Sequence, residues 1–262
     1  MGEHFYEVEG DTAVPTELTR GPWDPDSQHA GPPAALLGRA LEQIPIDEGT
    51  PMRIGRVTYE VLRPLPIAPL RIEAGVERDG KRVQMAGASI YADDDEVMRA
   101  RAWRLRTEPV ELGAGFEPRP PGHGPEDGEP AEFFPTGADA GYHTAVEYRF
   151  VRGSWLEPGP ATVWMRSRVA VVAGEELTPL QRVLVVADSG NGVSATLDWR
   201  RFLFINVDLS VHLHRYPAGE WVCLDAVTTP DADGIGLADT ALYDERGPIG
   251  RAAQTLLVAA RP

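Results

Sequence analysis

The sequence predicts an α+β fold of two similar halves, each an antiparallel sheet wrapped around one central helix, with both halves fused in one chain. Three observations predict it. Two segments repeat the same order of features, alternating apolar and polar runs in each segment indicate strands, and one apolar helix precedes the main strand run of each segment. A chain of 262 residues leaves open one large domain or two small ones.

The repeat relates segment 1–107, the expected N-terminal half, to segment 141–262, the expected C-terminal half. The two align at a constant offset of 152 residues, without a gap between Arg63 and Arg99. The matched features are Arg63-Pro64 with Arg215-Tyr216-Pro217, Tyr91 with Tyr243, and Arg99-Ala100 with Arg251-Ala252. The equal spacing of these features, rather than letter-by-letter identity, indicates the duplication.

Residues 108–140 separate the halves. They contain seven prolines, six glycines and eight acidic residues against one arginine. Such a composition buries too little apolar surface to order itself strongly. We therefore expect an acidic linker rich in proline and glycine.

Each half is expected to form its sheet from alternating runs. In the first half these runs are His4–Glu9, Arg56–Arg63, Leu70–Arg78, Gln84–Ala92 and Val97–Arg106. In the second half they are Ala145–Arg152, Thr162–Val172, Asp208–Arg215, Glu220–Thr229, Gly236–Tyr243 and Ile249–Ala259. Acidic turns join the last two strands of each half, as an antiparallel hairpin requires.

The two expected helices have clear start and stop signals. The first runs from Pro32 to Ile44, begins at a Pro-Pro pair and ends before Pro45. The second runs from Pro179 to Asp188, with Thr178 as its N-cap. Its residues are apolar nearly all round, so we expect protein on most of its sides.

An antiparallel sheet curled around one buried helix and present twice is a double hotdog. At this level the chain resembles the acyl-CoA thioesterase II type of double-hotdog protein and the broader thioesterase-like families. The residues that carry the resemblance are Gln28–Leu37 in the first half and Asn206–Asp208, His214–Arg215, Gly219–Trp221 and Arg251–Gln254 in the second. The resemblance covers most of the chain outside the linker.

The resemblance implies hydrolysis of acyl-CoA by a held water, with three site residues in the second half. These are Asp188 at the end of the helix, Asn206 two residues before a strand-opening aspartate, and Gln254 on the last strand. Asn206 departs from the family pattern, which has a hydroxyl there. At the offset of 152 the first-half counterparts are Leu36, Ile54 and Ala102, all apolar. We therefore expect one polar site and a silent equivalent.

The chemistry of a thioester needs no covalent nucleophile, because a carboxylate can take a proton from a positioned water. Asp188 is the expected base, and Asn206 and Gln254 would position the water. Backbone N–H groups near Ala30 and Gly31, at the start of the first helix, are expected to bind the thioester oxygen and so to contact substrate. No metal and no organic cofactor is expected.

Composition limits the partners. The net charge of −15 argues against nucleic acid and anionic membrane surfaces. The single cysteine, Cys223, excludes an intrachain disulfide, no apolar run is long enough for a membrane span, and no leader is recognised before His4. We expect a cytoplasmic protein whose partner is acyl-CoA, and association into homo-oligomers is left open.

Several alternatives stay open at this point. Asp188 is also typical of a helix-ending Asx turn, and Asp208 of a structural ion pair. His212 and His214 lie on one face of a strand and form an incomplete metal pattern. His29 with a carboxylate would suit a hotdog hydratase or dehydratase, and a decayed site would leave a non-catalytic acyl-binding protein. Four arginines are candidates for CoA phosphates: Arg166, Arg168, Arg200 and Arg201.

Overall fold

The computed structural model describes residues 2–46, 51–113, 115 and 119–261. In the first half the strands are β1 (His4–Glu9), β2 (Thr12–Pro15), β3 (Met52–Val61), β4 (Leu70–Arg78), β5 (Val83–Ala92) and β6 (Asp95–Arg106), with helix α1 (Gly31–Gln43) and the short η1 (Glu17–Thr19). The segment between the halves contains η2 (Pro125–Asp127) and β7 (Glu129–Pro130). The expected linker positions 114 and 116–118 lie outside the described residues.

The second half follows the same plan. Its helices are α2 (Tyr142–Ala145), α3 (Pro179–Ala187) and α4 (Gly190–Val193), and its strands are β8 (Val146–Ser154), β9 (Glu157–Ser167), β10 (Ala170–Val172), β11 (Phe202–Asn206), β12 (Asp208–Leu213), β13 (Val222–Pro230), β14 (Ile235–Asp244) and β15 (Gly247–Ala260). Both expected helices and the expected strands are present, with ends shifted by a few residues, but the expected strand Thr162–Val172 is wrong as one element. The chain forms two strands there, because β9 pairs with β8 and β13 whereas β10 pairs with β1. Sequence patterns missed the shorter elements β2, β7, β11, α2 and α4.

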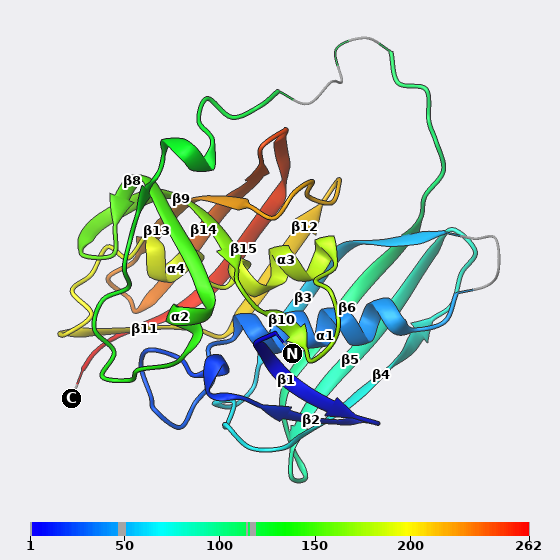
Figure 1. Ribbon diagram of the computed structural model, residues 1–262, viewed down its shortest axis with the longest axis horizontal. Helices are drawn as coiled ribbons and strands as arrows, with labels where there is room; N and C mark the ends of the chain where they lie inside the picture. Colours follow the sequence, from blue (N-terminus) through cyan, green and yellow to red (C-terminus); the bar gives the residue numbers. More distant parts are fainter. Residues whose placement is uncertain (1, 47–50, 114, 116–118, 262) are drawn as a thin grey trace.

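All strands form one sheet in the order β10-β1-β2-β4-β5-β6-β3-β12-β15-β14-β13-β9-β8-β7, and β11 also pairs with β15 (Figure 1). The halves join where β3 and β12 pair in antiparallel fashion, with Thr58 directly opposite Ser210. These two residues are 152 positions apart, so the pairing lies on the pseudo-twofold axis that relates the repeats. Strands β4 and β13, and β5 and β14, also start 152 residues apart. The repeat read from the sequence is confirmed for these strands.

The central helices α1 and α3 lie side by side inside the curled sheet (Figure 1). A Cβ added at Gly31 would overlap the Val185 carbonyl oxygen, and one added at Gly38 would overlap the Leu184 side chain. The first position therefore sets how closely the start of α1 approaches the end of α3. From Leu180 onward all apolar side chains of α3 are buried, as the all-round apolar pattern predicted.

The constant offset does not extend to the helices. Helix α1 starts 148 residues before α3 and has 13 residues against 9. Leu36 therefore lies inside α1, whereas Asp188 directly follows the last residue of α3, and the expected match of Leu36 with Asp188 is wrong. The matches of Ile54 with Asn206 and of Ala102 with Gln254 fall on strands that keep the offset.

The described part of the segment between the halves from residue 119 onward is not a free tether. Strand β7 pairs with β8, and the Ala131 N–H donates to the Tyr148 carbonyl. Phe133 packs against Trp155 with ring centroids 4.2 Å apart. The acidic, proline-rich composition predicted weak order. Composition alone does not reveal that the folded protein offers a sheet edge and an apolar surface against which these residues can pack. The division into 1–107, 108–140 and 141–262 stays a prediction.

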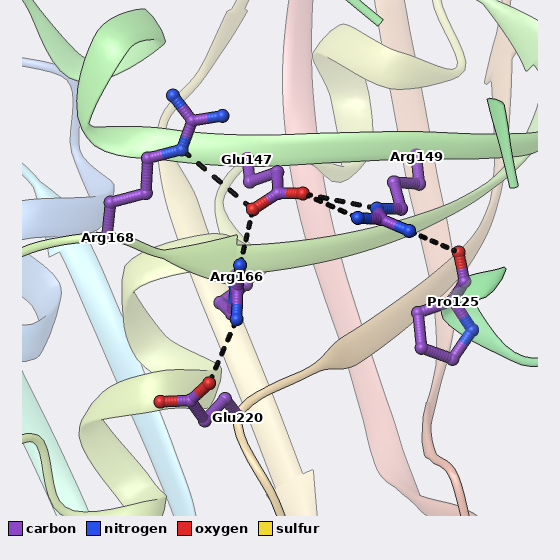
Figure 2. Close-up of polar contacts among 6 residues, drawn as sticks. All are labelled: Pro125, Glu147, Arg149, Arg166, Arg168 and Glu220. Carbon is purple, nitrogen blue, oxygen red and sulfur yellow. Dashed lines mark hydrogen bonds and ion pairs between the residues drawn. The ribbon is translucent and has the colours of Figure 1, made fainter. Parts of the chain in front are cut away.

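Glu147 on β8 anchors this docking (Figure 2). Its carboxylate accepts hydrogen bonds from Arg149 at 3.1 Å and from Arg166 at 2.6 Å, and Arg168 lies 3.9 Å away. Arg149 in turn donates to the Pro125 carbonyl of η2. One partly buried carboxylate thus contacts three arginines and, through Arg149, is linked to η2, the turn that precedes the edge strand β7.

We expect Gly31→Ala to lower the free energy of unfolding by about 1–3 kcal/mol, because the new Cβ meets a backbone carbonyl that cannot rotate away. Gly38→Ala is the matched control. There the new Cβ meets the flexible end of Leu184, and alanine has a helix propensity better than glycine by about 1 kcal/mol. Chemical denaturation measures both variants. Equal losses in the two would contradict the close approach at Gly31.

We expect Glu147→Gln to lower the free energy of unfolding at neutral pH by about 1 kcal/mol, since the arginines involved are partly exposed. Desolvation by itself raises the pKa of Glu147, but the hydrogen bonds from Arg166 and Arg149 outweigh it and lower that pKa. The stabilisation is therefore present above the unfolded pKa of about 4.3 and is lost as the pH falls through the folded-state pKa.

Denaturation at a series of pH values should show the wild type and Glu147→Gln converging in acid. Glu220→Gln, which removes only one exposed partner of Arg166, is the control and should change stability less. A difference that stayed constant down to pH 3 would contradict this assignment.

Candidate active site

Asp188 directly follows α3 as its C-cap and is 8% exposed. Its Oδ1 atom accepts two hydrogen bonds, one from Asn206 Nδ2 at 2.8 Å and one from Gln254 Nε2 at 3.1 Å. The donors come from β11 and β15, 18 and 66 residues along the chain. The structure therefore brings together the three residues that the sequence singled out, and Asp188 does not close a local Asx turn with them.

The Gln254 amide is fixed on both of its atoms. Its Oε1 accepts from the backbone N–H of Asn191 at 3.0 Å, and its Nε2 also donates to the Asp188 carbonyl at 3.0 Å. Gln254 is 2% exposed. These contacts allow only one orientation of the amide, with the nitrogen toward Asp188.

The second carboxylate oxygen faces His29. Asp188 Oδ2 lies 3.4 Å from His29 Nδ1, and that nitrogen accepts the Gly31 N–H at 3.0 Å. A neutral imidazole has one acceptor nitrogen, so this bond assigns the proton of His29 to Nε2. Burial lowers the pKa of His29, while the Asp188 carboxylate acts in the opposite direction. The ring of His29 stacks on Tyr142 at a centroid distance of 3.8 Å.

Tyr142 ties this stack to the end of α3. Its hydroxyl donates to the Val185 carbonyl and lies 2.9 Å from Ser189 Oγ. Burial raises the pKa of Tyr142 well above its ordinary value, with a hydrogen bond from Ser189 opposing and the Asp188 carboxylate adding to the effect. The phenol is therefore a neutral support for His29 and α3.

The start of α1 offers fewer free N–H groups than expected. Gly31 N–H is taken by His29, Pro32 and Pro33 have none, and Ala34 N–H donates to the Ala30 carbonyl. Among the described residues, no hydrogen bond of the Ala30 N–H is found. Of the two expected substrate contacts, Gly31 has a packing role against Val185, and Ala30 keeps an available donor.

Other candidates lie elsewhere. Within the described chain Asp208 has no ion-pair partner, and its carboxylate accepts the Thr255 N–H at 2.6 Å, between β11 and β12. His212 and His214 are exposed, and the described chain holds no group of three metal-ligating side chains. Cys223 is buried, and desolvation together with the Asp225 carboxylate raises the pKa of its thiol. These residues lie outside the polar cluster, which consists of Asp188, Asn206, Gln254 and His29.

Sequence reasoning missed the roles of Tyr142 and Asn191 altogether and gave His29 only to an alternative function. No sequence motif marks Tyr142, which follows Ala-Gly, as a functional residue. Asn191 stands in a Ser-Gly-Asn-Gly run that is typical of a turn. The run instead forms α4. Only its position directly after the candidate base could have drawn attention to it.

The four candidate arginines divide into two pairs. Arg166 and Arg168 converge on Glu147 (Figure 2). Arg200 and Arg201 are exposed beside aromatic side chains, with Arg200 over the ring of Trp199. That ring belongs to a cluster with Trp23, Phe134 and Phe204. Binding of CoA phosphates by any of them stays a prediction.

Comparison with protein families identifies both halves. The model of the acyl-CoA thioesterase N-terminal domain matches residues 19–105, and that of the acyl-CoA thioesterase C-terminal domain matches residues 125–258. Together they span most of the chain. The chain belongs to the acyl-CoA thioesterase family. No curated protein matches the sequence.

Solved structures show that this thioesterase-family chain has the double-hotdog fold. A hot-dog-fold protein from Alicyclobacillus acidocaldarius is 17% identical with a TM-score of 0.72, covering 98% of this chain and 96% of that one. A candidate thioesterase II from Thermobifida fusca is 17% identical, TM-score 0.74, covering 97% and 94%. The tesB protein of Mycobacterium avium subspecies paratuberculosis is 16% identical, TM-score 0.67, covering 98% and 96%. At these identities the likeness concerns the fold.

No helix in the described part of this thioesterase-family chain is both long and apolar enough to cross a membrane.

We expect His29 to be neutral and protonated on Nε2 at pH 7, with a pKa below the ordinary value of about 6.5. The unfolded chain then binds the proton first, so the stability contributed by neutral His29 is present above about pH 6.5 and is lost as the pH falls. Nitrogen-15 NMR of the imidazole measures tautomer and pKa. His29→Phe keeps a ring on Tyr142 without titrating, and its stability should vary less with pH. An Nδ1–H tautomer would contradict the bond from Gly31.

Proposed function

We propose that the protein hydrolyses acyl-CoA thioesters to a free acid and CoA, with Asp188 as general base. One observation carries the proposal. Asp188 Oδ1 is held by two amide donors, whereas within the described chain Oδ2 accepts no hydrogen bond and faces His29. A buried carboxylate with one oxygen fixed and one oxygen free is suited to orient a water and take its proton.

In this mechanism water donates one hydrogen to Asp188 Oδ2 and attacks the thioester carbonyl carbon. The proton moves to the carboxylate as the carbon–oxygen bond forms, and the carbonyl oxygen becomes an oxyanion. The carbon–sulfur bond then breaks, and the proton held by Asp188 passes to the departing thiolate. The carboxylate is thus returned to its starting state, and no external reductant, oxidant or covalent intermediate is needed.

Asn206 and Gln254 support the base. Both donate to Asp188 Oδ1, so they fix the direction of Oδ2 and lower the cost of burying the charge. The family pattern has a hydroxyl at the position of Asn206. An amide supplies the same single donor to Oδ1, so the departure is compatible with activity.

Ala30 N–H is the proposed donor to the oxyanion. It lies at the start of α1, where the helix dipole favours developing negative charge, and Gly31 N–H is already bonded to His29. A cytoplasmic location, the absence of nucleic-acid and membrane partners, and association into homo-oligomers stay predictions.

A second candidate is a hotdog hydratase or dehydratase that uses His29, because His29 lies 3.4 Å from the carboxylate. The occupied lone pair on Nδ1 weighs against it. In the neutral ring Nε2 carries the proton, so His29 has no free basic nitrogen while Gly31 N–H remains bonded. A third candidate, a non-catalytic acyl-binding protein, would leave the cluster intact without turnover.

We expect Asp188→Asn to reduce kcat for acyl-CoA hydrolysis by at least about a hundredfold, the usual loss when a general base is removed. Free thiol release from a panel of acyl-CoAs measures it. Asp208→Asn is the matched control, because Asp208 bonds Thr255 outside the cluster. It should keep most of the activity.

The same assays separate the candidates. Equal thiol release by wild type and Asp188→Asn would remove Asp188 as the base. Acyl-CoA binding without thiol release would favour the binding protein. Addition of water to an enoyl-CoA, lost in His29→Phe, would favour the hydratase.

A further inference from the structure

The outer face of the second half carries a group of exposed aliphatic side chains on β11, β15, β14 and β13, which lie side by side in that order (Figure 1). Ile205 lies opposite Leu257, and Leu257 lies opposite Ile235, so these three side chains form a row across three strands. Residues that lie opposite each other, or two apart on one strand, point to the same face of a sheet. The outer patch consists of the five aliphatic residues that share this face: Ile205, Val227, Ile235, Leu237 and Leu257.

The outer patch points away from the core. Its residues are 43–63% exposed, whereas Ala226, Ala238 and Leu256, which alternate with them along the strands, are buried. Five aliphatic side chains that are each about half exposed make an apolar surface on the order of 400–500 Å². Single exposed aliphatic residues are ordinary, but a contiguous patch of this size often marks an interaction surface.

The first half shows that the strand framework does not require these residues. The offset of 152 places Arg53 where the second half has Ile205, and Gly75 where it has Val227. The other three counterparts are apolar. The same sheet positions thus accept an arginine and a glycine, so the continuous apolar surface of the second half has a reason other than strand pairing.

Charges of both signs border one end of the outer patch. On the β11 side Arg201 is exposed, and its carbonyl accepts the Arg261 N–H of the neighbouring chain end. On the opposite side the turn between β13 and β14 carries Asp231 and Asp233, and the Val258 N–H donates to this turn. Positions 258 and 261 are three residues apart, so the two groups lie within about 10 Å of each other along β15. Within the described chain none of these four charged side chains has an ion-pair partner.

A second copy of the chain fits both the apolar surface and the charges. When two identical sheets pack face to face about a twofold axis parallel to their strands, each strand meets a strand from the opposite side of the axis. With the axis between β14 and β15, Leu257 of one copy packs against Ile235 of the other. The Arg201 side of each copy then faces the turn with Asp231 and Asp233 in the other. The outer patch is therefore complementary to itself in shape of charge as well as in hydrophobicity.

The area agrees with what a stable dimer needs. A standard interface buries about 800 Å² per partner, of which somewhat more than half, or about 450 Å², is non-polar. The outer patch supplies this non-polar area, and the bordering charges supply a polar rim. The net charge of −15 on each copy opposes association. At physiological salt, however, charges further apart than about 8 Å are largely screened, so the contacts at the rim dominate.

We infer that the outer patch is the interface of a homodimer, in which the outer sheet faces of two copies pack together. The inference does not depend on the proposed hydrolysis. Asn206 and Gln254 point to the inner face of the sheet, where they bond Asp188. The candidate site therefore stays open when the outer faces are covered.

Sedimentation equilibrium of the full chain at about 0.15 M salt tests the interface. We expect twice the mass of 28.5 kDa at protein concentrations of about 10–100 μM, within the affinity range of interfaces of this size. Ile235→Asp puts a charge into the centre of the apolar row. It should raise the dissociation constant at least about thirtyfold, the loss typical of a central interface residue.

Val83→Asp is the matched control. Val83 is the counterpart of Ile235 at the offset of 152, lies opposite Leu105 in the first half, and is 39% exposed. This variant should leave the dissociation constant unchanged, and circular dichroism should show that both variants fold. A monomer at every concentration overturns the inference, as does a dimer that Ile235→Asp does not weaken more than Val83→Asp does.

A charge exchange tests whether the occupant is a second copy. Arg201→Asp and Asp233→Arg should each weaken the dimer by about fivefold to tenfold, because each places like charges opposite one another in two symmetric contacts. The double variant presents opposite charges again and should restore most of the affinity. Single variants that weaken the dimer without restoration in the double variant would overturn this arrangement of the two copies.

Discussion

The close approach of α1 to α3 at Gly31 determines where the candidate site can form. The absence of a side chain at Gly31 lets the start of α1 lie against the Val185 carbonyl near the end of α3. As a result His29, which precedes α1, meets Asp188, which follows α3. The site is therefore built from both halves, although its three expected catalytic residues all come from the second. A chain that held the halves further apart would have the carboxylate without the imidazole.

The two halves have the same strand framework and differ in what they add to it. Asn206 and Gln254 stand where the first half has Ile54 and Ala102, on strands paired in the same way. The second half also has a shorter central helix, followed by α4 and β11. These additions place the backbone N–H of Asn191 against Gln254 and so fix the orientation of the Gln254 amide. The strand framework is common to both halves, whereas the three expected catalytic residues of the candidate site come from the second half alone.

The hydrogen bonds already formed by Asp188 and His29 distinguish these two candidate bases. Asp188 and His29 are adjacent, but each has one position already bonded: Oδ1 of the carboxylate by two amides and Nδ1 of the imidazole by the Gly31 N–H. The carboxylate retains a second oxygen, whereas the neutral imidazole has no second lone pair. The hydrogen bond from Gly31 thus connects the packing of the central helices to the choice of base.

The sequence by itself determined the strands, the two central helices and the duplication, because side-chain periodicity, helix caps and repeat spacing are local properties of the chain. It also singled out Asp188, Asn206 and Gln254, through resemblance and the apolar counterparts of the last two. Only the tertiary structure decided that the Gly31 N–H donates to His29 and that Asp208 accepts a backbone N–H from Thr255 instead of pairing with an arginine. It also decided that the segment between the halves pairs with the sheet through β7. Each of these depends on groups far apart in the sequence, whose distance no local pattern records.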